Sequence, residues 1–134
     1  MKVEQALELL KKYNHEEFHI VHGKTVSGVM GYFASKYDAE NVEYWQVVGM
    51  LHDIDFELYP NEHCVKCMEI FEQEGVSVDI AKSCASHGYG LCQSEIEPIH
   101  IMEKVLFATD ELTGLIGAAA RMRPSKSVSD MELS

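Results

Sequence analysis

Apolar residues recur every three or four positions along most of the chain, which is the spacing of helices that bury one face. This spacing predicts a first helix marked by Val3, Ala6, Leu7 and Leu10, a second helix at about 15–37 and a third at about 42–52. The second helix has an inward face on which a histidine joins three apolar residues, namely His22, Val26, Val29 and Phe33. The third helix has a buried face formed by Tyr44, Trp45, Val48 and Leu51.

Three further helices are predicted in the second half of the chain. The fourth spans about 61–75, and Ser77 can cap a fifth that ends around His87. The sequence Ser-Glu-Ile-Glu at 94–97 is a capping box for a sixth helix, which continues, with a break near Gly114, to about residue 121. No segment alternates between apolar and polar residues for long. The pattern therefore predicts an all-α bundle of about six helices, without a sheet.

Composition narrows the class of protein. The 134 residues, 46% of them hydrophobic, are enough for one domain with its own core, which we expect at 1–126. The polar tail at 127–134 is expected to be the start of a truncated or disordered helix. The amphipathic N-terminus lacks the apolar core of a signal peptide, and no apolar run is long enough for a bilayer. We therefore expect a cytoplasmic protein with no membrane partner.

The chain is strongly acidic, with a formal net charge of −11. Such a surface repels phosphate backbones, so duplex nucleic acid is not expected as a partner. A small anionic substrate could still bind if a metal ion supplied local positive charge.

Several potential metal ligands fall on helix faces that should be apolar. His22 points inward, His52 and Asp53 lie where the third helix ends, and Asp110 shares a face of the sixth helix with Leu106. An unpaired carboxylate inside a helical core costs several kcal/mol. A divalent cation would compensate Asp53 and Asp110, with His22 and His52 completing its ligands. Neighbouring side chains on a helix diverge by about 100°, so a cation between them could be held by both if the helix end adjusts.

This order of residues, His22, His52-Asp53 and Asp110, resembles the HD superfamily of metal-dependent phosphohydrolases. The similarity extends from about residue 15 to 126 and includes the stretches LHDIDFELYPNEHC, SHGYG and EKVLFATDELTGLIGAAARMRPSKS, which look like small stand-alone bacterial members. The resemblance implies a helical bundle in which these four residues bind one or two divalent cations (Fe, Mn, Zn, Ni, Co or Mg). It also implies hydrolysis of a small phosphorylated molecule or nucleotide by a metal-activated water, with Asp53 as the catalytic residue.

Two departures from the family pattern keep other functions open. His52-Asp53 is followed by Ile54, Asp55 and Phe56 rather than by a Gly-Lys that contacts phosphate, and the run at His87 is not the HD-GYP signature. One alternative is a metal-binding regulatory or ligand-binding module with little or no turnover. Another is an oligomeric scaffold with a structural metal, and a homo-oligomer is compatible with all three functions.

The remaining polar residues have two interpretations each. His87 could bind a second metal or substrate, or simply end a helix. Asp55 could hydrogen-bond a ligand imidazole or cap a turn. His63 and Glu62 are interpreted as a solvated first helical turn, and Cys64 and Cys67 as core thiols, because no second cysteine pair completes a zinc motif. Arg123 and Lys126 could bind phosphate, or they could simply be solvated surface residues.

Overall fold

A computed structural model describes residues 1–89 and 101–110 of the chain. All regular structure in these residues is helical, without a strand, as the sequence predicts. The α-helices are α1 (Val3–Tyr13), α2 (Glu17–Tyr37), α3 (Val42–Leu51), α4 (Lys66–Gln73), α5 (Val78–Ser86) and a helical segment at 101–110; short 3-10 turns lie at Ala39–Asn41 and Pro60–Glu62.

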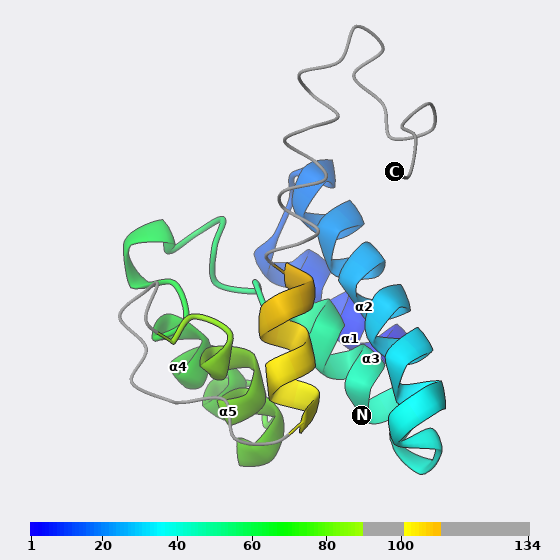
Figure 1. The fold of residues 1–134 in the computed structure, drawn as a ribbon. Helices are drawn as coiled ribbons and strands as arrows, with labels where there is room; N and C mark the ends of the chain where they lie inside the picture. The colour runs from blue at the N-terminus through cyan, green and yellow to red at the C-terminus, as the bar shows by residue number, and fades with distance from the viewer. Residues whose placement is uncertain (90–100, 111–134) are drawn as a thin grey trace, which may run out of the picture.

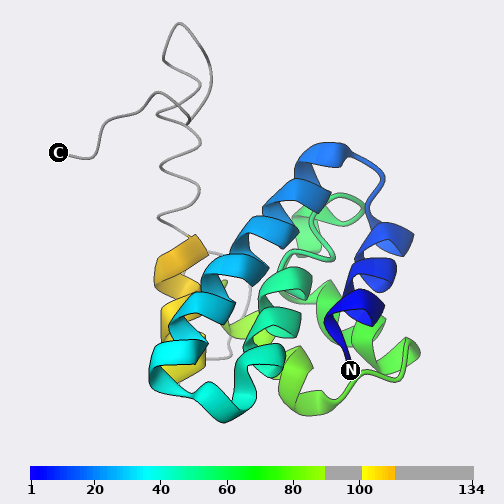
Figure 2. The same cartoon turned by 90° about the vertical axis from the view of Figure 1, so that its right-hand side faces the viewer.

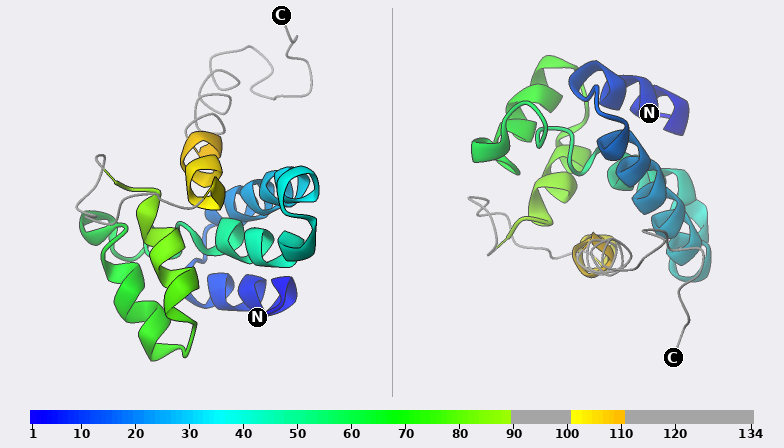
Figure 3. Two further views of the ribbon diagram at one scale, coloured as in Figure 1. Left: turned by 60° about the horizontal axis from the view of Figure 1, so that its bottom comes forward. Right: turned by 90° about the horizontal axis from the view of Figure 1, so that it is seen from above.

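The helices form two groups with the helical segment 101–110 between them. In Figure 1, α1, α2 and α3 lie on one side and α4 and α5 on the other, and the segment 101–110 is drawn in yellow and orange. The turned view in Figure 2 shows this segment beside α2, and the view from above in Figure 3 shows it on the open side between the two groups. Helix α3 is central, because it packs against α1, α2 and α5.

The core is built around α3. Five consecutive residues, Val47 to Leu51, are buried, which is the pattern of a helix enclosed on nearly every side. Trp45 and Phe71 are the largest fully enclosed side chains. Burial of each such side chain stabilises the fold by roughly 1.5–3 kcal/mol before entropy is subtracted. The predicted face of α3 is confirmed at Trp45, Val48 and Leu51, whereas Tyr44 is only half-buried.

Close approach of α2 and α3 depends on a glycine. A Cβ added at Gly49 would lie 3.1 Å from both Cα and N of Ser27 and 3.0 Å from Cγ of Met30. These distances are shorter than ordinary van der Waals contact, and two of the atoms belong to the α2 backbone. The absence of a side chain at Gly49 therefore lets the two helices pack tightly, three residues before His52.

Two helix boundaries differ from the sequence prediction. Helix α2 begins at Glu17 rather than at residue 15, because the amides of His15 and Glu16 donate to the Glu57 carboxylate at 2.7 Å each. The predicted fourth helix is wrong in its first part. Pro60–Glu62 forms a 3-10 turn, and α4 starts only at Lys66. The Ser77 cap of α5 is confirmed, since its side chain accepts from the Ile80 amide at 3.4 Å.

The predicted face of α2 is shifted. Val26 is buried as expected, but Val29 and Phe33 are half-buried and the core side is completed by Met30 and Ala34. No helix within residues 1–89 and 101–110 combines the length and apolar character of a membrane span. The predicted capping box at 94–97, the break near Gly114, Arg123, Lys126 and the tail at 127–134 lie outside the described residues.

Candidate metal centre

Four residues from three helical regions meet at one point beside α3. His22 comes from α2, His52 and Asp53 follow α3, and Asp110 ends the described part of the helical segment 101–110. His22 Nε2 lies 3.2 Å from His52 Nε2 and 3.1 Å from Asp110 Oδ1, which is 3.0 Å from His52 Nε2. Asp53 Oδ2 lies 3.1 Å from His22 Nε2 and 3.3 Å from His52 Nε2. These four residues, the first cluster, could hold a metal ion.

The end of α3 explains how adjacent residues serve one point. The helix stops at Leu51, and a turn follows in which the Ile54 amide donates to the Leu51 carbonyl at 3.1 Å. The Phe56 amide then donates to the Asp53 carbonyl at 3.0 Å. In a regular helix the side chains of adjacent residues point about 100° apart. Because the α-helical hydrogen bonds end at His52, the backbone of Asp53 is not held in this geometry, and its carboxylate reaches the His52 imidazole.

A second cluster lies against the other oxygen of Asp53. Asp53 Oδ1 lies 3.1 Å from His63 Nε2 and 3.0 Å from His87 Nε2. One ligand atom from each of His63, Cys64 and His87 lies within 4.8 Å of the other two, and these three residues, the second cluster, could also hold a metal ion. Asp53 is therefore shared between the clusters, with one carboxylate oxygen directed at each.

Three of the four histidines are oriented by hydrogen bonds from Nδ1. His52 Nδ1 donates to the Gly49 carbonyl at 2.6 Å, and His87 Nδ1 donates to the Cys84 carbonyl. His63 Nδ1 donates to Asp55 Oδ1 at 2.6 Å. A neutral imidazole whose Nδ1 carries the proton presents an unprotonated Nε2, which is the form that binds a cation. In each case that Nε2 faces the clusters.

Asp55 fixes the loop that carries His63. Its side chain is fully buried, and its second oxygen accepts from the amides of Cys64 at 2.8 Å and Cys67 at 2.9 Å. One carboxylate thus orients the His63 imidazole and the start of α4 together. Between its two predicted roles, the geometry favours hydrogen bonding to an imidazole of the site.

The carboxylates and imidazoles of the first cluster shift each other's pKa values. Burial acts to lower the pKa of His52, but the Asp53 charge and the Asp110 hydrogen bond raise it well above its usual value. The hydrogen bonds of His22 to Asp110 and Asp53 raise the pKa of His22. Burial opposes ionisation of Asp53, yet the nearby His52 and His22 hold the pKa of its carboxyl well below the usual range. The ionised carboxylates are thus stabilised by nearby positive charge, which either protonated imidazoles or a bound cation can supply.

This positive charge is not supplied by ordinary ion pairs. Within the described residues, the ion-pair partners of Asp53 and Asp110 are all histidines, with no lysine or arginine among them. Buried carboxylates without a permanent cation are costly unless a metal or protonated imidazoles compensate them. The donor set of imidazole nitrogens and carboxylate oxygens suits a divalent transition metal.

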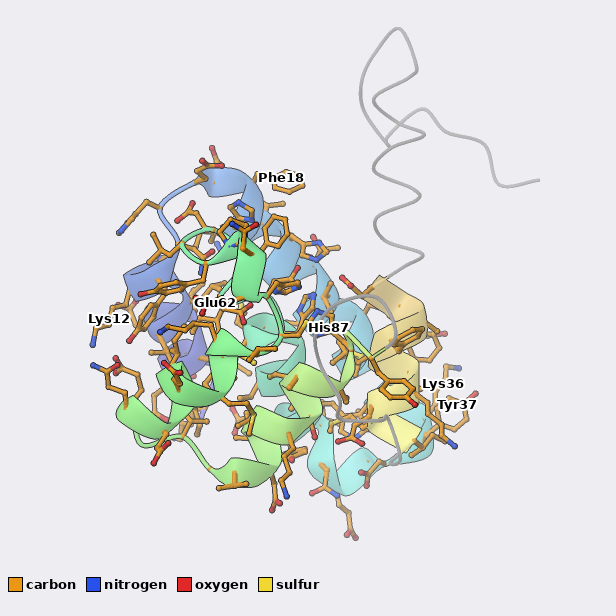
Figure 4. The ribbon with its side chains drawn as sticks, turned by 90° about the vertical axis from the view of Figure 1, so that its left-hand side faces the viewer. Lys12, Phe18, Lys36, Tyr37, Glu62 and His87 are labelled. Carbon is orange, nitrogen blue, oxygen red and sulfur yellow. The ribbon has the colours of Figure 1, made fainter. Side chains whose placement is uncertain are left out.

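The centre is open on one side. The His52 and His87 side chains are 0% and 3% exposed and form its floor, whereas those of Asp53 and Asp110 are 23% and 26% exposed. Figure 4 shows His87 in the interior of the molecule, in contrast to the peripheral Lys12 and Tyr37. A small molecule could therefore reach Asp53 and Asp110 from solvent while the imidazoles stay buried.

The sequence identified most of this constellation but misjudged His63. His22, His52, Asp53 and Asp110 come together as expected, and His87 lies against Asp53 rather than simply ending α5. The interpretation of His63 as a solvated helical residue is wrong, since its side chain is 13% exposed and precedes α4 in a turn. No spacing in the sequence identifies His63, because its hydrogen-bond partner Asp55 is eight positions away, on the other side of a turn.

Comparisons of the chain with family models, with curated proteins and with solved structures gave no match in any of the three. Residues 1–89 and 101–110 form an all-helical structure with buried His/Asp clusters that could bind metal. Its similarity to the HD superfamily stays a prediction from the sequence motifs.

Proposed function

We propose that the protein is a metal-dependent phosphohydrolase that acts on a small phosphorylated molecule or nucleotide. The observation that carries this proposal is the convergence of four imidazole nitrogens on the two oxygens of Asp53, at a position that solvent can reach. Asp110 adds a second carboxylate on the open side. Sites with this ligand type and free coordination positions perform hydrolysis, whereas structural zinc sites are usually closed by four Cys and His ligands.

The residues present fit a divalent cation. His22, His52, Asp53 and Asp110 would hold one cation, and His63 and His87 would hold another against the far oxygen of Asp53. Orientation of three imidazoles through Nδ1 prepares Nε2 for this role. A bound cation would supply positive charge for the phosphoryl oxygens and lower the pKa of a nearby water.

In the reaction, an oxygen of water forms a bond with phosphorus while the bond from phosphorus to the leaving oxygen breaks. Asp53 would accept the water proton, because its carboxylate borders both clusters and its side chain is 23% exposed. The proton then passes to the leaving oxygen or to solvent. His52 is buried and donates a hydrogen bond to the Gly49 carbonyl, and this bond fixes the position of its imidazole relative to α3.

Charge favours a small substrate. The net charge of −11 repels a polyanion, whereas a single phosphate group can be neutralised locally. Arg123 and Lys126 remain candidates for holding the rest of the substrate, on sequence grounds alone.

The test begins with protein purified without chelator, and elemental analysis of its metals. Phosphomonoesters, phosphodiesters and nucleotides are then screened with Mn²⁺, Co²⁺, Ni²⁺, Fe²⁺ and Mg²⁺. We expect hydrolysis of at least one class, and its loss in Asp53→Ala and Asp110→Ala but not in the exposed-site control Asp79→Ala. Stoichiometric metal with no hydrolysis of any class would instead support a metal-binding regulatory module. A protein that binds no metal would exclude both functions.

A further inference from the structure

Cys64 lies inside the second cluster, although the sequence offers it only as a core thiol. Its residue is 1% exposed, and its Sγ is 3.6 Å from His87 Nε2. It directly follows His63, and one ligand atom of each of His63, Cys64 and His87 lies within 4.8 Å of the others. A buried sulfur therefore sits beside the two imidazoles that face Asp53 Oδ1.

The backbone holds Cys64 in an unusual conformation. Its φ of 70° is the only positive value at a residue other than glycine in the part of the chain that the structure describes. L-residues rarely adopt this left-handed region, and such residues gather at functional sites. The Asp55 carboxylate stabilises the conformation by accepting the Cys64 amide at 2.8 Å, while it also accepts from His63 Nδ1. One buried anion thus sets the directions of both His63 and Cys64.

We propose that Cys64 binds a cation as a thiolate in the second cluster, together with His63 Nε2, His87 Nε2 and Asp53 Oδ1. This assignment deepens the proposed function by naming a ligand set and a class of metal, and it requires metal binding but no hydrolysis. The thiol proton leaves to solvent as the sulfur–metal bond forms, so the metal keeps its oxidation state.

Cys64 Sγ lies 3.6 Å from His87 Nε2 and 3.9 Å from His87 Nδ1, so the sulfur sits beside the imidazole ring rather than in line with the Nε2 lone pair. Rotation of the Cys64 side chain would turn Sγ toward a cation shared by His63 Nε2, His87 Nε2 and Asp53 Oδ1. Sulfur, imidazole nitrogen and carboxylate oxygen are all ligand types that zinc accepts in proteins.

Cys67 and Cys84, in contrast to Cys64, are thiols of the protein core. Burial and then the Asp55 charge raise the pKa of the Cys67 thiol well above its ordinary value. Burial also raises the pKa of Cys84, whose Sγ donates to the Val48 carbonyl at 3.6 Å. Neither belongs to a cluster that could hold a metal among the described residues. Cys67 is thus a matched control for Cys64, because it is buried, nearby and also bonded through its amide to Asp55.

Sulfur changes which metals the second cluster accepts. Thiolate ligands favour Zn²⁺, Co²⁺ and Fe²⁺ over the hard cations Mg²⁺ and Mn²⁺. The first cluster has only nitrogen and oxygen donors and accepts a wider range. We therefore expect two Co²⁺ or Zn²⁺ per chain, but only one Mn²⁺.

The test titrates metal-free, reduced full-length protein with Co²⁺ in the absence of oxygen and records the near-ultraviolet sulfur-to-cobalt charge-transfer band. We expect the band in the wild type and in Cys67→Ala, and no band in Cys64→Ser or Cys64→Gly. Glycine adopts the positive φ freely, so Cys64→Gly should fold even if the serine variant does not. Affinity for the second Co²⁺ should fall further than the roughly 10–100-fold that loss of an outer hydrogen-bond partner causes.

The proposal is overturned if the wild type binds two Co²⁺ without the band, if it binds fewer than two, or if the band survives in Cys64→Gly. Failure of the proposed function has a different signature, because a protein that hydrolyses no phosphate ester would still show the band. Asp110→Asn separates the clusters further, since it should weaken the first Co²⁺ site and leave the band in place.

Discussion

His87 and Asp53 are 34 positions apart in the sequence, and His87 Nε2 lies 3.0 Å from Asp53 Oδ1. The other oxygen of Asp53 faces His22 at 3.1 Å. A single carboxylate therefore links the residue that ends α5 to a residue of α2. This relationship makes Asp53 the one side chain whose loss should affect both clusters.

Asp53→Asn is expected to abolish metal binding at both clusters, because the amide retains the shape of the side chain but not its charge. Asp110→Asn should reduce binding only at the first cluster, which Asp110 contacts through His22 and His52. Elemental analysis after dialysis against Zn²⁺ measures the result, with circular dichroism to verify folding. Two metals per chain in Asp53→Asn would contradict the shared role of this carboxylate.

Asp55→Asn should weaken metal binding at the second cluster by about 10–100-fold, the usual effect of losing a partner that orients a ligand histidine. The amide group can accept from only one side, so either His63 Nδ1 or the two amides of Cys64 and Cys67 lose their acceptor. We expect a loss of about 2–3 kcal/mol in the free energy of unfolding.

Zn²⁺ titration and urea unfolding measure the two effects of Asp55→Asn. The exposed residue Asp79, in the first turn of α5, provides the control Asp79→Asn. Equal effects of the two substitutions would mean that Asp55 does not orient His63.

Gly49→Ala is expected to destabilise the protein by about 1–3 kcal/mol, because the added methyl group would press on the α2 backbone at Ser27. The same displacement would separate His22 from His52 and weaken metal binding at the first cluster. Gly28→Ala is the matched control in α2, since a Cβ there meets nothing within 4 Å. That control should gain about 0.5–1 kcal/mol. Urea unfolding measures the stability of both variants. A loss at Gly49 with a gain at Gly28 would mean that close packing, rather than helix propensity, determines the effect of a side chain at position 49.

A pH effect is expected where α1 meets the end of α4. Tyr13 Oη donates to Glu74 Oε1 at 2.7 Å, and this hydrogen bond, followed by burial, raises the pKa of Tyr13 from 10.0 to about 12. Because the folded pKa is the higher one, the contribution is fully present below pH 10.0 and is lost as pH rises through about 12. Tyr13→Phe should therefore cost about 1 kcal/mol of unfolding free energy at neutral pH and progressively less in strong alkali.

Ultraviolet titration gives an independent measurement, since the Tyr13→Phe variant should lack one late-titrating phenol. Glu74→Gln should lower that late pKa toward 10.0, because the glutamine removes the carboxylate acceptor. The Tyr13–Glu74 contact in solution would be excluded if Tyr13→Phe removed a phenol that titrates near 10.0 and Glu74→Gln left the tyrosine titration unchanged.

Periodicity in the sequence was sufficient to predict an all-helical chain and to bring four site residues into one hypothesis. His22 and Asp110 stood out because each is polar on a face that must otherwise be apolar, and such positions need a physical reason. Adjacency of His52 and Asp53 at the end of a buried helix supplied the rest. The helix face of a residue and its distance from a helix end can both be inferred from the spacing of residues along the sequence.

The second cluster follows from contacts that local spacing does not record. Helix spacing placed His63 in a regular first turn, but the buried Asp55 carboxylate accepts the amides of Cys64 and Cys67 and delays α4 to Lys66. The left-handed backbone at Cys64 has no signature in the hydrophobic pattern.

The sequence by itself therefore determined most of the helices and indicated the residues of the first cluster, because the buried face of each helix follows from side-chain periodicity along that helix. Only the tertiary structure decided that Asp53 serves two clusters. That outcome depends on the packing of α5 against α3, which brings His87 to the far oxygen of Asp53, and on the turn that directs His63 to the same atom.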